Sequence, residues 1–377
     1  METDLIYQLA LSTIKGLSPS YAKKLIDHFG SASAIFHAPS REIAAISEMG
    51  EKKAAAIARF TEFPSLEKEI KFLEKYAIHP LFITDKAYPQ RLLDNDDAPV
   101  LLFYKGNADL NAARVVSIIG TRSPTEYGKT TTEQLVKELS ATGALIVSGL
   151  AYGIDTAAHK AALKHDLQTV GILAHGLDRI YPPENTPLAK DMLKHGGLLT
   201  CFCSGNDPET YHFPIRNRIV AGICDALIVT ETRQKGGSML TIHNALSLKK
   251  KIFAVPGRMS DTRSTGCNAL IQKNKATLLM SAKTLLEEMQ WDHPSGKPIE
   301  KQPFGQSSLF PATADMTGLS DDEKRIFTLL KEKKKQYIDD IASATGLNFG
   351  KLALPLLSLE WKNLIISQPG KLYCILE

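Results

Sequence analysis

Short apolar runs alternate with helical patterns through the middle of the chain. Each run has the length of a buried strand, and the segment after it carries apolar residues at helical spacing. We expect strands at residues 115–120, 144–149, 169–174, 197–202, 226–231 and 251–255. Helices are expected at residues 126–141, 155–165, 186–194, 215–224 and 238–250. Strand–helix alternation of this length predicts an α/β domain with right-handed crossovers and one parallel, doubly wound sheet.

The pattern before this domain, at residues 1–75, is entirely helical. A hydrophobic–glycine turn opens a short amphipathic helix twice, at residues 16–20 and at residues 49–50. The two units resemble tandem helix-hairpin-helix, or SAM-like, motifs, whose turns can present backbone N–H groups to a nucleic-acid phosphate. The alternative is a helical bundle used for packing or protein contact, because turn residues such as Ser18 and Glu51 are not strongly basic.

The central domain is expected to occupy residues 76–290. Residues 76–105 contain short apolar runs between proline and aspartate clusters, which predicts a lead-in that contains strands. Residues 281–291 are typical of a closing helix. Residues 291–318 are rich in Pro, Gly, Ser and Gln and lack periodicity, so we interpret them as a linker.

The last segment, residues 319–377, predicts three helices followed by two strands. The helical patterns lie at residues 321–331, 337–345 and 348–362. Three helices and a β-hairpin match a winged helix, whose third helix often reads the DNA major groove. Here the third helix is mostly apolar, which favours a protein-contact or regulatory role.

Candidate chemistry begins where the first strand of the central domain ends, at Gly120, Thr121 and Arg122. A glycine lets backbone N–H groups approach an anion, and the next helix offers its positive N-terminus. Arg122 adds a forked, permanently charged donor set suited to phosphate. The dinucleotide fingerprint G-x-G-x-x-G is absent, because Thr121, Arg122 and Ser123 follow Gly120. A Walker A loop is also absent, because Ser123 occupies the position of its first glycine. The alternative is a plain turn with a solvated arginine.

Other strand ends carry residues of the same kind, and parallel strands bring them to one edge of the sheet. They are Ser148, Gly149, Phe213, Arg216, Asn217, Arg218, Lys235, Gly237, Ser238 and Arg258. We expect the five cations of this edge to gather there, with the reservation that Arg216 or Arg218 is tied into an internal ion pair. Phe213 either stacks a base, worth about 1–3 kcal/mol, or belongs to the core. Cationic loops beside aromatic rings favour single-stranded nucleic acid over duplex.

Composition adds few constraints. The 377 residues are 44% hydrophobic and 23% charged, with a net charge of +4, which is ordinary for a globular protein with a weak basic bias. No stretch approaches the roughly 20 apolar residues that span a bilayer, and the acidic start METDLIYQLA is unlike a signal peptide. We therefore expect a cytoplasmic protein without membrane contact. The five cysteines include no C-x-x-C pair, which predicts reduced, buried thiols and no zinc site.

Seven strings of the central domain together match one family pattern. GTR after a strand, SGLAYGID, HGLDRIYPPEN, FPIRNRIVAG, GGSMLTIHNA, and FAVPG with STGCNALI occur in order within residues 81–279. Together they resemble the DNA processing protein A (DprA/Smf) family. The helix-hairpin-helix-like and winged-helix-like flanks are similar to those of longer family members.

The resemblance implies an extended Rossmann fold, a homodimer formed through the central domain, and no catalytic activity, cofactor or metal. It implies that the protein binds and protects incoming single-stranded DNA and loads the RecA recombinase during natural transformation and recombination. The family's DNA pocket corresponds to Gly120, Thr121, Arg122, Ser148, Gly149, Phe213, Arg216, Asn217, Arg218, Gly237 and Ser238. Residues 268–279 are a plausible dimer edge.

The chain departs from the family pattern at four places. Residues 200–203 stand where family members often have an S-E-x-P string, and residues 274–276 stand where they have a G-A pair. Thr210 occupies the position of a basic residue, and Pro183 occupies the position of a lysine. These losses predict weaker DNA binding, and Lys235 and Arg258 are hypothetical compensations.

The alternative is a Rossmann-fold nucleotide-processing enzyme similar to a phosphoribohydrolase. Such enzymes use a PGGxGT-x-x-E pattern, and the loop at residues 235–241 lacks the glutamate. Asp155, Asp178 and Glu231 remain as carboxylates, for which capping or structural roles are expected. His159 and His165 are six apart, which does not suit a shared metal on one helix face.

Overall fold

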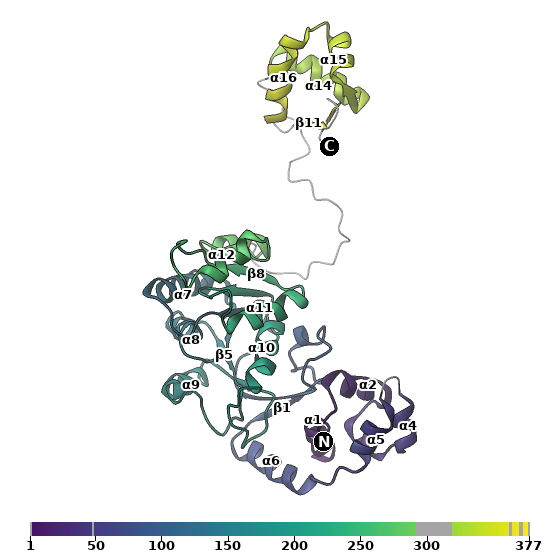
Figure 1. Cartoon of the computed structure of the whole chain (residues 1–377), viewed down its shortest axis with the longest axis vertical. Coiled ribbons are helices and arrows are strands. Elements are labelled where there is room, and N and C mark those ends of the chain that lie inside the picture. The colour runs from purple at the N-terminus through teal and green to yellow at the C-terminus, as the bar shows by residue number, and fades with distance from the viewer. Residues whose placement is uncertain (1, 47–48, 292–318, 362–363, 369–371, 376–377) are drawn as a thin grey trace. The chain divides into compact units, whose positions relative to one another are not determined.

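Nine strands form the central sheet. They are β1 (His79–Phe82), β2 (Leu101–Gly106), β3 (Val115–Ile119), β4 (Leu145–Ser148), β5 (Thr169–Ile172), β6 (Gly196–Thr200), β7 (Ala226–Val229), β8 (Lys251–Ala254) and β9 (Thr277–Leu278). Their spatial order is β1-β2-β6-β5-β4-β3-β7-β8-β9 (Figure 1). This computed structural model describes residues 2–46, 49–291, 319–361, 364–368 and 372–375. The chain divides into two units, residues 1–295 and residues 296–377.

Helices cover both faces of the sheet, and the predicted strand–helix alternation is confirmed. The helices of this domain are α7 (Glu126–Leu139), α8 (Ile154–Lys164), α9 (Thr186–Met192), α10 (His212–Gly222), α11 (Ser238–Ser247), α12 (Thr265–Gln272) and α13 (Ala282–Glu288). Successive residues of β3 point to opposite faces. Val116 and Ile118 pack in the core beneath α7, α8 and α13, whereas Val115 and Ile119 pack in the core beneath α10 and α11. Two buried faces explain why the strands are continuous apolar runs.

The prediction of a purely parallel sheet is wrong at one edge. The lead-in segment supplies β1 and β2, which pair antiparallel with each other, and β2 also pairs antiparallel with β6. The hydroxyl of Tyr104 in β2 accepts from the backbone N–H of Ala108 at 2.7 Å and lies within donating distance of the carbonyls of Ala108 and Gly196, at 3.0 and 3.1 Å. Gly197 leaves the space that this ring needs, since a Cβ there would lie 2.7 Å from the Tyr104 hydroxyl. An apolar run of strand length does not show whether the strand runs parallel or antiparallel to its neighbour. Here the packing of Tyr104 fixes the antiparallel direction.

The order of the sheet reverses at β3. The chain proceeds from β3 through β4 and β5 to β6 on one side, then returns to place β7, β8 and β9 on the other. Ligands of open α/β sheets bind outside the carboxyl ends of the strands at such a switch point. A ligand site is therefore expected at the loops that follow β3 and β7.

Before the sheet, the described residues form six helices, which belong to the same unit (purple in Figure 1). They are α1 (Glu2–Thr13), α2 (Pro19–Phe29), α3 (Ala32–His37), α4 (Ser40–Ala45), α5 (Gly50–Ala58) and α6 (Phe63–Lys75). Pro19 starts α2 at a position where no N–H is needed, and Gly30 ends it with φ +80°. Glu69 of α6 accepts hydrogen bonds from the backbone N–H of Ser204, at 2.9 Å, and from its hydroxyl. Lys23 donates to the carbonyl of Asn95 at 2.6 Å.

The C-terminal unit has its own core. It contains α14 (Asp321–Lys333), β10 (Lys335–Tyr337), α15 (Ile338–Thr345), α16 (Phe349–Trp361), β11 (Ile365–Gln368) and β12 (Leu372–Ile375). The three strands form an antiparallel sheet in the order β10-β12-β11. The three helices and the last two strands agree with the sequence, and β10 is an additional strand. The predicted linker lies, apart from Trp291, outside the described residues.

Candidate nucleic-acid interface

A pocket of about 540 Å³ opens at the switch point. Its walls come from the loops after β3, β4 and β7 and from the first turns of α10 and α11. We call it the switch-point pocket and define it by the residues that line it: Ile119, Gly120, Thr121, Arg122, Ser123, Gly149, Ala151, Asp155, Phe213, Pro214, Arg216, Asn217, Val220, Thr232, Arg233, Gly236, Gly237, Ser238, Leu240, Thr241 and Arg263. It brings together residues from separate segments of the chain.

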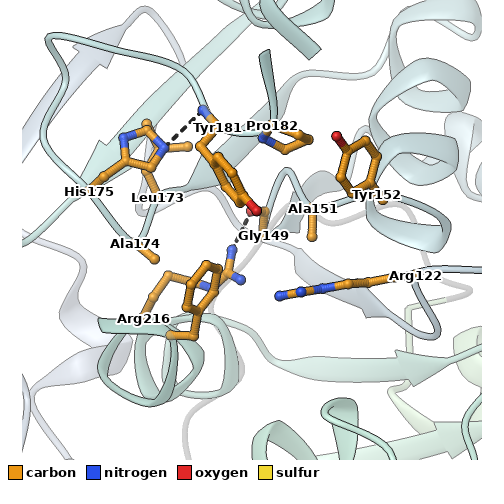
Figure 2. Close-up of a pocket in the computed structure, with 11 residues that line it drawn as sticks. Arg122, Gly149, Ala151, Tyr152, Leu173, Ala174, His175, Tyr181, Pro182 and Arg216 are labelled. Atoms are coloured by element: carbon orange, nitrogen blue, oxygen red, sulfur yellow. Dashed lines mark hydrogen bonds between the residues drawn. The ribbon is translucent and has the colours of Figure 1, made fainter. Parts of the chain in front are cut away.

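The ring of Phe213 lies beside two arginines in this pocket. The guanidinium carbon of Arg122 is 5.2 Å from the ring centroid, and that of Arg216 is 5.6 Å from it. Figure 2 shows the two guanidinium groups extending into the same space from opposite sides. Phe213 is half-buried and does not belong to the fully buried core. A partly exposed ring beside two cations can stack a base while its phosphate is held.

Phe213 owes its position to an earlier helix start than the sequence predicts. α10 begins at His212, three residues before the expected start, so Phe213 and Pro214 lie in its first turn. Proline is tolerated there because the first N–H groups of a helix have no partner within the helix. The ring of His212 is fixed by a 2.8 Å hydrogen bond between Nδ1 and the carbonyl of Asp207.

Arg216 is a structural cation beneath the pocket more than a surface charge. It is buried, and its Nη1 donates to the carbonyls of Gly149 and Ile172, while its Nε donates to Asn217 Oδ1 at 3.0 Å. A side chain at Gly149 would collide with this Nη1. Burial lowers the pKa of Arg216 to about 10, and neighbouring Asp155 opposes that shift. Arg216 therefore stays charged at neutral pH and fixes the loop after β4.

Of the three carboxylates raised by the enzyme alternative, Asp178 and Glu231 are engaged in structural contacts, whereas Asp155 lines the switch-point pocket. Asp155 is buried, and burial raises its pKa although Arg216 opposes this. Asp178 pairs with Arg179 at 2.7 Å. Glu231 accepts hydrogen bonds from the backbone N–H and the hydroxyl of Thr125, at 2.9 and 2.5 Å, and so holds the start of α7.

The structure places most of the predicted site residues around the switch-point pocket. Those that line it are Gly120, Thr121, Arg122, Gly149, Phe213, Arg216, Asn217, Gly237 and Ser238. Ser148 lies just beneath, fully buried, and its hydroxyl donates to the carbonyl of Ile118 at 2.5 Å. It therefore shapes the end of β4 and does not face the cavity.

Three predicted cations do not line the pocket. Arg218 forms an ion pair with Asp97 at 3.2 Å, in the acidic loop after β1. Lys235 and Arg258 are exposed beyond the lining. Of the five cations that were expected at this edge of the sheet, Arg122 and Arg216 line the pocket.

Sequence reasoning missed two further arginines of the lining, Arg233 and Arg263. Arg233 lies in the loop that follows β7, four residues after the strand ends, so its place after a predicted strand was a usable signal. Arg263 is brought in by tertiary packing, because the backbone N–H of Gly266 donates to the carbonyl of Thr232 at 2.8 Å. Both arginines add positive charge to the lining of the switch-point pocket.

A second cavity, of about 50 Å³, adjoins the first (Figure 2). We call it the Tyr181 pocket; it is lined by Arg122, Gly149, Ala151, Tyr152, Leu173, Ala174, His175, Tyr181, Pro182, Phe213 and Arg216. His175 Nε2 accepts from the backbone N–H of Tyr181 at 3.2 Å, and its Nδ1 donates to the Gly176 carbonyl at 2.8 Å. Burial lowers the pKa of His175, so the ring is neutral and fixed.

The cysteines are free thiols, but they are not uniformly buried. Cys224 and Cys267 are buried, whereas Cys201, Cys203 and Cys374 are half-buried. Burial raises the pKa of Cys201 and Cys203 to about 12, so both are protonated at neutral pH. Within the described ranges, no cluster of three metal-ligating side chains occurs, and no helix is both long and apolar enough to cross a membrane.

Comparison with protein families gives two matches. A model of DNA recombination-mediator protein A matches residues 79–290, and a model of a SAM-like helix-hairpin-helix tandem matches residues 9–60. The first range contains the sheet and both pockets. The second contains the two hydrophobic–glycine turns, so the expected N-terminal helix-hairpin-helix domain is confirmed.

Individual relatives agree. The DNA processing protein DprA of Bacillus subtilis is 39% identical over 63% of this chain and 80% of its own length. The protein Smf of a Synechocystis species is 30% identical over 97% of this chain and 98% of its own.

Solved structures extend the agreement to the fold. DprA of Streptococcus pneumoniae superposes with a TM-score of 0.66 at 34% identity, over 75% of this chain and 97% of that one. DprA of Helicobacter pylori, described for its single-stranded DNA binding mode, gives a TM-score of 0.53 at 30% identity over 58% and 98%.

Proposed function

The chain belongs to the DNA recombination-mediator protein A family, and on that premise we propose that it binds single-stranded DNA without sequence preference. The observation that carries the proposal is the half-buried Phe213 ring beside Arg122 and Arg216. A base stacks on such a ring whatever its identity, and Arg122 neutralises the adjacent phosphate. The glycine-rich turns at Gly120 and Gly237 add backbone donors beside them.

The proposal extends to the strand's fate. Bound single strands are protected and passed to the RecA recombinase during recombination and natural transformation, with the protein acting as a mediator and not as an enzyme. The Helicobacter pylori relative, described for its single-stranded DNA binding mode, supports the binding step. The protein acts as a homodimer through residues 268–279, an edge that carries β9 and the exposed Leu278.

Two accessory regions take supporting roles in this proposal. The C-terminal unit is a winged helix that contacts protein partners, because its third helix, α16, is rich in apolar residues. The departures at Pro183 and Thr210 each remove a cation of the family pattern, and Arg233 and Arg263 supply positive charge in the lining of the switch-point pocket.

The test is binding of a fluorescent oligo-dT, followed by anisotropy at two salt concentrations, with duplex of equal length as competitor. We expect tight binding that weakens with salt and that duplex displaces poorly, because phosphate contacts release counterions. Absence of binding at low salt would overturn the proposal and make nucleotide hydrolysis the next assay.

A variant pair locates the site. Arg122→Ala should weaken binding to oligo-dT and to mixed sequences alike and reduce the slope of log K against log salt by about 0.7. Arg179→Ala is the matched control, because Arg179 is a surface arginine paired with Asp178 and Asp207 outside the pocket lining. A folded Arg122→Ala protein with the wild-type slope would show that Arg122 does not hold a DNA phosphate.

A further inference from the structure

We propose that the DNA strand leaves the switch-point pocket across Arg122 and continues along a second groove, where Lys160 and Lys129 hold its backbone phosphates. The inference rests on the proposed function and adds a binding surface to it. The groove, with a volume of about 700 Å³, lies where α7 and α8 begin. We call it the α7–α8 groove; it is lined by Arg122, Ser123, Pro124, Lys129, Tyr152, Gly153, Thr156, Ala157, Lys160 and Asn185.

Shared residues make the groove continuous with the site already described. Arg122 lines the switch-point pocket, the Tyr181 pocket and the α7–α8 groove. Tyr152 lines the Tyr181 pocket and the groove, and in Figure 2 it stands with Arg122 on the side away from His175. A phosphate held by Arg122 therefore has one neighbouring nucleotide in the pocket and the next at the mouth of the groove.

Among the described residues, the lining of the groove carries cations and no carboxylate. Lys160 is exposed and forms no ion pair within the part of the chain that the structure describes. Lys129 lies 3.5 Å from Glu126, but both side chains are largely solvated, and such pairs are weak. Lys129 is therefore available to a stronger anion such as a phosphodiester.

The start of one helix adds to this charge. Ser123 and Pro124 precede α7, and Gly153 is the N-cap of α8, so the starts of both helices border the groove. Because the Glu231 carboxylate already accepts from Thr125 at the start of α7, only the start of α8 adds a positive helix end, and the lysines supply most of the charge.

The polar groups of the groove wall are already occupied, which argues for backbone recognition. Asn185 Nδ2 donates to the carbonyl of Leu150 and to the hydroxyl of Thr156, each at 2.9 Å. That hydroxyl in turn donates to the carbonyl of Ala151 at 2.7 Å. The contacts that remain are the cations and the half-exposed ring of Tyr152, and neither discriminates between bases.

The experiment uses Lys160→Ala and Lys160→Glu in the full-length protein, with Lys164→Ala as control. Lys164 is one turn further along α8, pairs with Glu133, and does not line the groove. Anisotropy is measured with fluorescent oligo-dT of about 6 and about 20 nucleotides over a salt series. For the longer strand we expect Lys160→Ala to lower the salt slope by about 0.7 and Lys160→Glu to weaken binding further. The short strand and the control should behave as in the wild type.

Each other outcome overturns the inference in a recognisable way. A wild-type slope for both Lys160 variants would exclude the groove as a strand path, while the wild-type protein still binds DNA as proposed above. Equal loss on the short and long strands would place the effect in the switch-point pocket. A dependence of dTMP affinity on Lys160 would assign the groove to a free nucleotide. Failure of the wild type to bind either strand would instead contradict the proposed function itself.

Discussion

At the scale of single residues, burial sets the protonation states of two basic side chains near the switch-point pocket. Arg216 is held by backbone carbonyls, and His159 of α8 lies in the same buried layer, where Arg216 contributes to lowering its pKa. The hydroxyl of Thr169 donates to the carbonyl of Ile146 at 2.9 Å. Its oxygen must therefore accept from His159 Nδ1, which is 2.6 Å away. His159 is thus a neutral Nδ1–H tautomer.

This residue predicts a pH dependence of stability. Burial lowers the pKa of His159 from 6.5 to about 3. Between these values the unfolded state binds a proton that the folded state does not, so stability falls as pH falls below 6.5. The contribution of His159 to the loss of unfolding free energy is about 2 kcal/mol at about pH 5. We expect the unfolding free energy of His159→Gln, measured with urea, to fall less between neutral and acidic pH than that of the wild type. An unchanged pH profile would show that His159 is protonated in the folded state.

Phe213 gives a prediction for binding. Phe213→Ala should weaken binding of single-stranded DNA by about 1–3 kcal/mol, the value of one base on an aromatic platform, and Phe213→Trp should restore most of it. Phe202→Ala is the control, because Phe202 packs on His212 with ring centroids 4.0 Å apart but does not line the pockets. Equal losses for Phe213→Ala and Phe202→Ala, measured by anisotropy, would indicate a packing effect rather than stacking.

At the scale of elements, the site depends on how closely the loop after β3 approaches the start of α8. Gly153 has φ +84°, and a Cβ there would lie 2.7 Å from Arg122 Cα and would collide with the carbonyl of Thr121. The backbone N–H of Ile154 donates to that same carbonyl at 3.2 Å. Helix α8 and the Arg122 loop are therefore one packed unit.

Replacing this glycine should disturb both. Gly153→Ala is expected to lower the unfolding free energy by about 1–3 kcal/mol, the cost of a strained backbone, and to displace Arg122. Gly237→Ala is the matched control, because Gly237 has φ −60° and a Cβ there would meet none of the described residues within 4 Å. Its unfolding free energy should change by no more than about 0.5 kcal/mol. Thermal unfolding of both variants tests this, and a fully stable Gly153→Ala would contradict the close approach.

At the scale of the whole molecule, the two units have separate cores. The C-terminal core, which includes Leu319, Phe327 and Ile365, contains no described residue of the first unit. The helical domain, by contrast, shares a core with the sheet and is also tied to it by Glu69 and Lys23. The helical domain and the sheet should therefore unfold together.

A shortened chain tests this division. Residues 1–295 should show the same melting temperature for the first transition and the same affinity for a short oligo-dT as the full chain, because their core is complete. Calorimetry and anisotropy provide the two readings. A lower melting temperature would mean that residues 296–377 stabilise the first unit.

The sequence by itself determined the strand–helix order, the N-terminal helices, and the loops that form the site. These features depend on local chemistry, because buried parallel strands need continuous apolar runs and their carboxyl ends share one edge. Gly120, Arg122, Gly149 and Phe213 could therefore be assigned to a common site from their positions after strands.

Only the tertiary structure decided which charges face that site. Arg218 is held by Asp97, which is 121 residues away along the chain, and Arg263 enters through the packing of Gly266 on Thr232. Burial, and not sequence position, turned Arg216 into a structural cation. The antiparallel edge likewise depends on Tyr104 fitting over Gly197. Such contacts join segments far apart in the chain, so no local pattern specifies them.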